Sequence, residues 1–106
     1  MTNSSKASAM TTGTILFSEW GWEQTNVDFY QIVRSTAKSV WIRPIAHTRK
    51  EVGFDEYEVE PLKDHFLDDN IKGELHRINK HGYITLTSYS IATPYKGESI
   101  LETTYA

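Results

Sequence analysis

Histidine and aspartate residues are the first candidates for chemistry in this chain. Three histidines and two neighbouring aspartates could ligate zinc, with water completing a catalytic site: His65, His76, His81, Asp64 and Asp68. The same residues could serve as acid–base pairs. Their spacing contains no tight ligand pattern, such as two histidines four residues apart on a helix. Scattered surface histidines explain them better, so we expect no metal site.

The hydroxyl side chains of serine and threonine lack the neighbouring residues that nucleophilic catalysis requires. Serine and threonine are frequent in 83–92, where their alternation is typical of the solvent face of a strand. No G-x-S-x-G turn surrounds any serine, and no glycine-rich loop could cradle a phosphate. The chain has no cysteine, which excludes disulfides and cysteine-ligated metals. We therefore expect no enzyme activity and no cofactor.

An acidic window is the clearest charge feature. Residues 54–69 carry seven acidic residues against one lysine, whereas the whole chain has a net charge of −3. Alternation with Tyr57 and Val59 predicts a strand that exposes a row of carboxylates about 7 Å apart. The acidic set could dock on a basic groove of a partner, including one that holds nucleic acid: Glu56, Glu58, Glu60, Asp64, Asp68 and Asp69. The same charges could instead protect an exposed sheet edge.

Basic and aromatic residues are interspersed in the segment 30–49, which precedes the acidic window. Aromatic side chains beside cations on a barrel surface are how OB-type modules hold single-stranded nucleic acid. The candidates for such a surface are Tyr30, Arg34, Trp41, Arg43 and Arg49. Alternatively, the aromatic rings belong to the core or its rim and the cations only solvate a hairpin, because acids in the same segment dilute the charge.

Trp20 and Trp22 form an aromatic pair around Gly21, followed by the turn-type residues Thr25 and Asn26. One interpretation is that at least one of the two indoles closes an end of the fold. The other is that one is exposed and contacts a partner, because tryptophan is a frequent interface anchor.

Short strands must position these residues. A chain of 106 residues is long enough for one domain. We expect a disordered leader over 1–12 and a single β domain over 13–106. No apolar run is long enough for a membrane helix, and the first residues lack a secretory signal. These features predict a cytoplasmic protein without a membrane partner.

The alternation pattern predicts a mainly β, antiparallel fold that forms a small barrel or strongly bent sheet, SH3-like or OB-like. Pro44 places the strand 39–48 at an edge or at a bulge. An apolar stripe containing Leu62 and Phe66 predicts one short helix, or alternatively an ordered loop, over 61–70. The predicted core residues are Val27, Phe29, Val33, Val40, Ile42, Tyr57, Val59, Ile84 and Leu86.

A distinctive pattern runs through the chain from Gly13 onward. It comprises W-G-x-x-Q-T-N-V-D-F-Y at 20–30, K-S-V at 38–40, T-S-Y-S at 87–90, and Y-K-G at 95–97 before the terminal T-Y-A. With this pattern the chain resembles a family of short, largely uncharacterised proteins encoded by phages, prophages and plasmids. It departs from them at Trp22, where tyrosine is usual, and in a longer acidic region over 54–69.

This resemblance implies a genetic setting rather than a reaction. Small cysteine-free proteins of mobile elements commonly act by occupying a host protein's surface. The expectation is a non-enzymatic protein-binding inhibitor of a host defence system, such as a CRISPR-Cas effector (an anti-CRISPR) or a restriction nuclease, in the cytoplasm of the bacterial host. Its partner would be a host protein with a basic nucleic-acid channel. The alternative is a nucleic-acid-binding small β-barrel.

Overall fold

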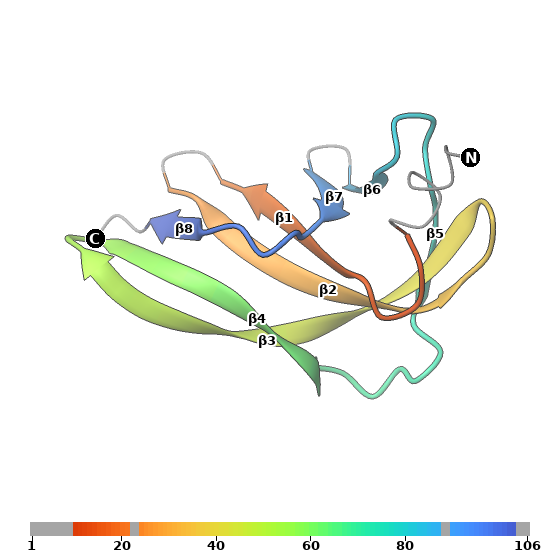
Figure 1. The fold of residues 1–106 in the computed structure, drawn as a ribbon, viewed down its shortest axis with the longest axis horizontal. Coiled ribbons are helices and arrows are strands. Elements are labelled where there is room, and N and C mark those ends of the chain that lie inside the picture. The colour runs from red at the N-terminus through yellow and green to blue at the C-terminus, as the bar shows by residue number, and fades with distance from the viewer. Residues whose placement is uncertain (1–9, 22–23, 88–89, 104–106) are drawn as a thin grey trace.

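One antiparallel sheet dominates the protein. The computed structural model describes residues 10–21, 24–87 and 90–103, which contain eight strands and no helix (Figure 1). Their order in the sheet is β6-β7-β1-β2-β3-β4-β8, and β5 pairs with β3 beside this path. The strands are β1 (Ile15–Trp20), β2 (Asn26–Ser35), β3 (Ser39–Gly53), β4 (Glu56–Phe66), β5 (Glu74–Arg77), β6 (Ile84–Thr87), β7 (Ser90–Pro94) and β8 (Ile100–Thr103).

The prediction of a mainly β, antiparallel fold is confirmed. The sheet is strongly twisted but open, so the prediction that it closes into a barrel is wrong. Closure would require the two end strands of the sheet, β6 and β8, to pair with each other, and the described residues contain no such pairing. The long β3 pairs with β2 and β5 in its first part and with β4 in its second part. The β3–β4 hairpin therefore extends beyond the paired part of β2 as an arm, with only the short strand β8 beside its outer part (Figure 1).

Two hydrophobic clusters lie on opposite faces of this sheet, which explains why it does not wrap around a single core. Phe17, Phe29 and Ile45 are in register across three strands and pack with Val59 and Ile100. The neighbouring positions along the same strands point to the other face, because side chains alternate along a strand. Leu16, Ile32, Val40 and Ile42 lie at such positions. They form the second cluster together with Met10, Ile84 of β6 and Ala92 of β7.

The predicted core is confirmed at six of nine positions. Val27, Phe29, Val40, Ile42, Val59 and Ile84 are buried. The other three, Val33, Tyr57 and Leu86, are half-buried. Leu16, Ile32, Ile45, Ala92 and Ile100 are buried but were not in the predicted core.

Pro44 lies in the central strand β3, so the edge alternative is wrong, and the bulge alternative fits better because the β3–β4 register shifts between Ile45 and His47. It sits where β3 changes its partner: Ile42 is opposite Glu74 of β5, and Ile45 is opposite Phe66 of β4. A residue without an N–H group is tolerated there because the ladder on that side is interrupted.

The helix predicted over 61–70 is absent, because β4 continues to Phe66. Asp64 has a left-handed backbone (φ 68°), which a right-handed helix does not allow. Gln31 holds this irregular point: the Asp64 N–H donates to Gln31 Oε1 at 2.7 Å, and Gln31 Nε2 donates to Asp64 Oδ1 at 2.9 Å. The predicted apolar stripe therefore belongs to an extended strand.

Part of the segment expected to be a leader is packed against the sheet. Within 1–12 the structure describes Met10, Thr11 and Thr12, and Met10 is only 4% exposed in the second cluster. Residues 1–9 lie outside the described residues, so the leader as a whole stays a prediction.

Candidate interaction surfaces

The row of glutamates lies on the outward face of β4. Glu56 and Glu60 are exposed, and Glu58 is half-buried and accepts a hydrogen bond from Ser99 Oγ at 2.7 Å. The residue between them, Val59, points to the opposite face and is buried. Glu56, Glu58 and Glu60 therefore form the continuous carboxylate row that the alternation indicated.

Two of these glutamates, Glu56 and Glu58, do not protect an open edge. From Glu56 to Val59, β4 is paired with β3 on one side and with β8 on the other. The edge strand at this place is β8. Protection against edge-to-edge pairing therefore does not account for Glu56 and Glu58, whereas Glu60 lies beyond the end of the β8 pairing.

The aspartates of the acidic window behave differently. Asp64 is held by Gln31, as described above. Asp68 Oδ1 lies 3.1 Å from Arg43 Nε, and the Asp68 carbonyl accepts a bond from Arg43 Nη2 at 2.7 Å. Asp69 is exposed. Asp64 and Asp68 thus stabilise the fold around the end of β4, and they are not part of the outward row.

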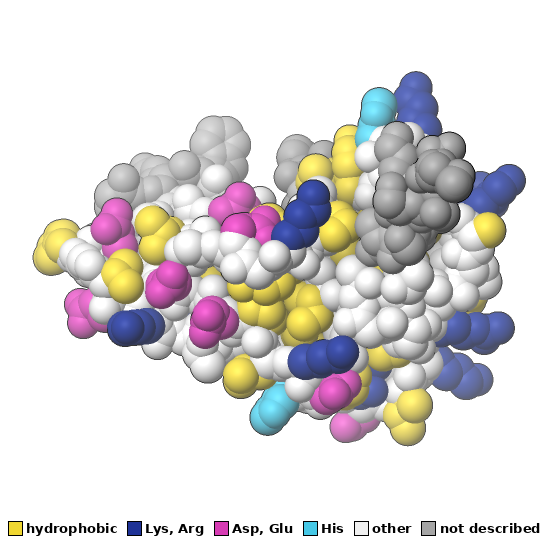
Figure 2. Space-filling view, viewed as in Figure 1, with side chains coloured by type: hydrophobic (Ala, Val, Ile, Leu, Met, Phe, Trp, Pro, Cys, Tyr) yellow, Lys and Arg dark blue, Asp and Glu magenta, His cyan; other side chains and the backbone are white. Residues whose placement is uncertain are grey.

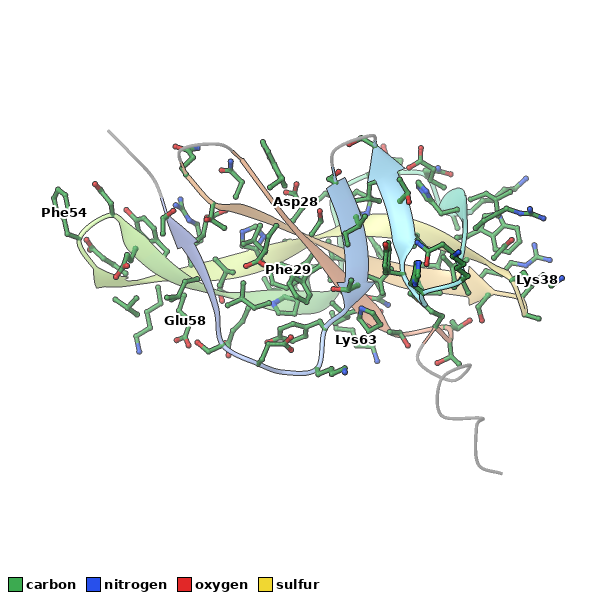
Figure 3. All side chains as sticks on the ribbon, turned by 90° about the horizontal axis from the view of Figure 1, so that it is seen from above. Asp28, Phe29, Lys38, Phe54, Glu58 and Lys63 are labelled. Carbon is green, nitrogen blue, oxygen red and sulfur yellow. The ribbon has the colours of Figure 1, made fainter. Side chains whose placement is uncertain are left out.

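The tip of the arm carries an apolar side chain that the sequence reasoning missed. Phe54 is 91% exposed in the turn between β3 and β4, with Val52 of β3 at 49% and Leu101 of the adjacent strand β8 at 43%. Figure 3 shows Phe54 projecting from the end of the arm, and Figure 2 shows acidic side chains gathered over this end of the molecule. The signal in the sequence was phenylalanine in a turn, where glycine, asparagine and aspartate are usual.

The outer part of the arm is held by Glu102, which lies opposite Tyr57 and is only 8% exposed. Its Oε2 accepts a hydrogen bond from the Val27 N–H at 3.0 Å, and its Oε1 lies 2.9 Å from Arg49 Nε. The Arg49 guanidinium also stacks on the Tyr57 ring, 4.1 Å from its centroid. Strand β8 thereby connects the arm to β2.

The predicted nucleic-acid set is not brought together. Arg43 and Arg49 are engaged with Asp68 and Glu102. Tyr30 packs in the second cluster, on the opposite face from Trp41. Burial first, and then the charges of Asp28 and Glu74, raise the pKa of the Tyr30 phenol.

Two members of that set do meet. The Arg34 guanidinium lies 4.7 Å from the centroid of the Trp41 ring, and the two residues are opposite each other on β2 and β3. The Arg34 side chain is exposed and Trp41 is half-buried.

Trp20 is 48% exposed at the end of β1, so it does not close an end of the fold. Its Nε1–H donates to Asp28 Oδ2 at 2.7 Å, which fixes the indole on the surface. Trp22 lies outside the described residues. Contact of either indole with a partner stays a prediction.

The histidines lie in separate environments. His65 is exposed, His76 Nε2 lies 3.0 Å from Glu74 Oε1, and the His81 ring stacks on Tyr83. In the part of the chain that the structure describes, no three metal-ligating side chains are grouped so that they could hold an ion. The five histidines and aspartates considered as candidate ligands are therefore not brought together.

The described residues contain no helix that is long and apolar enough to cross a membrane. No protein-family model matches the chain, and neither a curated protein nor a solved structure matches it.

Proposed function

We propose that this chain is a non-enzymatic protein-binding protein that docks the tip of its β3–β4 arm on a basic surface of a partner. The observation that carries the proposal is Phe54, 91% exposed in a turn whose flanks are acidic. Burial of an exposed phenylalanine in a partner's pocket contributes about 1.5–3 kcal/mol. That corresponds to roughly 10- to 150-fold in affinity.

The arm presents this side chain at a low entropic cost. Lys50 is paired with Glu58, and Gly53 is paired with Glu56, so β-pairing continues up to the turn. The bonds of Glu102 hold the outer part of the arm, beside Tyr57, against β2. A rigid element loses little conformational freedom on binding, and this favours affinity.

The charge of the arm defines the kind of partner. Residues 50–58 contain four acidic residues against Lys50 alone. Charge of one sign around an apolar side chain steers it toward a surface of the opposite sign. A protein that normally holds nucleic acid in a basic channel has such a surface. The resemblance to mobile-element proteins supports a host defence protein in the bacterial cytoplasm, with inhibition as the consequence of docking.

Capture from host lysate with the immobilised chain tests this proposal, followed by affinity measurements on the purified partner. We expect Phe54→Ser to weaken binding at least tenfold, and Glu56→Lys/Glu60→Lys to abolish it. The matched controls are Ile71→Ser, which removes another exposed apolar side chain, and Glu19→Lys, which reverses an exposed charge elsewhere. Full binding by both arm variants, together with loss in Arg34→Gln, would show that the arm is the wrong surface.

A further inference from the structure

The end of the molecule opposite the arm is basic. In Figure 3, Lys38 lies at one end of the long axis and Phe54 at the other. Segments 34–38 and 72–80 together carry five lysines and arginines against one acid, Glu74. That acid is engaged with His76, at 3.0 Å. In the described parts of the chain, Arg34, Lys38 and Arg77 are exposed and have no carboxylate within ion-pair distance.

Strand register places aromatic and apolar side chains among these cations. Arg34 of β2 is opposite Trp41 of β3, and Trp41 is opposite Leu75 of β5. Leu75 is 56% exposed. Arg77 lies on the same face, because it is two residues beyond Leu75 on the same strand. Lys38 is in the turn that leads into β3.

We propose that this basic–aromatic platform, formed by Arg34, Lys38, Trp41, Leu75 and Arg77, binds single-stranded nucleic acid. The three cations contact phosphates. Unpaired bases stack on the Arg34–Trp41 pair and on the apolar surface of Leu75, since both aromatic rings and guanidinium planes accept base faces. A single strand is favoured over a duplex because the base faces of a duplex are already stacked.

The negative net charge of the chain does not oppose this binding. The molecule is 45 Å long, and the acidic arm is at the far end. At physiological ionic strength, interactions between exposed charges are screened over about 8 Å. A phosphate at the platform therefore encounters mainly the local positive charge.

Fluorescence anisotropy with a labelled 20-residue oligothymidylate tests the platform. Three phosphate contacts predict a slope of roughly −2 in a plot of log affinity against log salt, so affinity falls about 20-fold between 50 and 200 mM salt. Arg34→Gln, Lys38→Gln and Arg77→Gln should each weaken binding and reduce the magnitude of the slope by about 0.7. Lys50→Gln, which removes an exposed lysine on the arm, is the matched control and should bind like the wild type.

Stacking has a separate readout. The oligonucleotide should quench tryptophan fluorescence, and Trp41→Phe should remove the quenching that Trp20→Phe leaves in place. Absence of binding at 50 mM salt would overturn the proposal, as would equal weakening by Lys50→Gln and Arg34→Gln. A duplex of the same length bound as tightly as the single strand would overturn the assignment to single strands. Phe54→Ser should leave this binding unchanged, so the result is independent of the arm and its partner.

Discussion

Glu102 provides a direct test of how the arm is held. Its buried carboxylate accepts a hydrogen bond from the Val27 N–H, and Val27 is only 1% exposed. In Glu102→Ala, that N–H loses its partner in a buried position, which costs about 1–3 kcal/mol. Loss of the Arg49 contact adds only about 0.2–1 kcal/mol, because the Arg49 side chain is 45% exposed and solvent screens the pair.

The expected total is therefore about 1–4 kcal/mol of lost stability, or a melting temperature lower by roughly 5–30 °C. Glu102→Gln keeps an acceptor for the Val27 N–H and should cost about 1 kcal/mol. Urea titration and thermal melts followed by circular dichroism measure both variants. Glu19→Ala, which removes an exposed carboxylate, is the control and should lie within about 0.5 kcal/mol of the wild type.

Equal stability of Glu102→Ala and the wild type would refute the role assigned to this carboxylate. Equal destabilisation by the alanine and glutamine variants would refute a narrower point, namely that the hydrogen bond to Val27 outweighs the ion pair. Amide exchange at Val27 separates these outcomes, since its protection should fall in the alanine variant and persist in the glutamine variant.

Three further predictions concern single side chains. Ser18→Ala should be neutral or stabilise the fold by about 1 kcal/mol in urea titration, because Ser18 Oγ is buried and has no hydrogen-bond partner among the described residues. A loss above about 1 kcal/mol would contradict this. The pKa of the Tyr30 phenol is raised, so the folded state keeps this proton above the unfolded pKa near 10. The free energy of unfolding should therefore fall as the pH rises from about 10 through the folded pKa. Tyr30→Phe should remove the share of this fall that Tyr30 causes. Phe54→Ser should change the free energy of unfolding by less than about 0.5 kcal/mol, since the ring is almost fully exposed; a larger loss would give Phe54 a role in stability.

The alternation of apolar and polar residues predicted the fold class because side chains repeat with a period of two along a strand. Strand β2 shows what this pattern can predict and what it cannot. Val27 and Phe29 lie on one face and Ile32 on the other, and all three are buried. The pattern showed that both faces of β2 are apolar, which suggested the wall of a barrel. An open sheet with a separate cluster on each face produces the same pattern, so the sequence could not distinguish the two.

Long-range partners account for the other differences. The apolar spacing of Leu62 and Phe66 fits a helix locally, but Gln31 holds Asp64 in a backbone conformation that a helix excludes. Arg43 and Arg49 looked available for phosphate because Asp68 and Glu102 are distant in the sequence, the latter by 53 positions. Residues such as Phe54 and Arg77 were missed for a related reason, since exposure and register depend on the neighbouring strands.

Strand β3 joins the two proposed surfaces. It contains Trp41 of the platform near its start and Val52 of the arm near its end. Eleven residues of extended chain span about 36 Å, which exceeds the screening length several-fold. A partner on the arm and a nucleic-acid strand on the platform would therefore not interact strongly by charge through this chain. Binding at one end should change affinity at the other by less than twofold, and a stronger coupling would require that β3 and its neighbours change conformation.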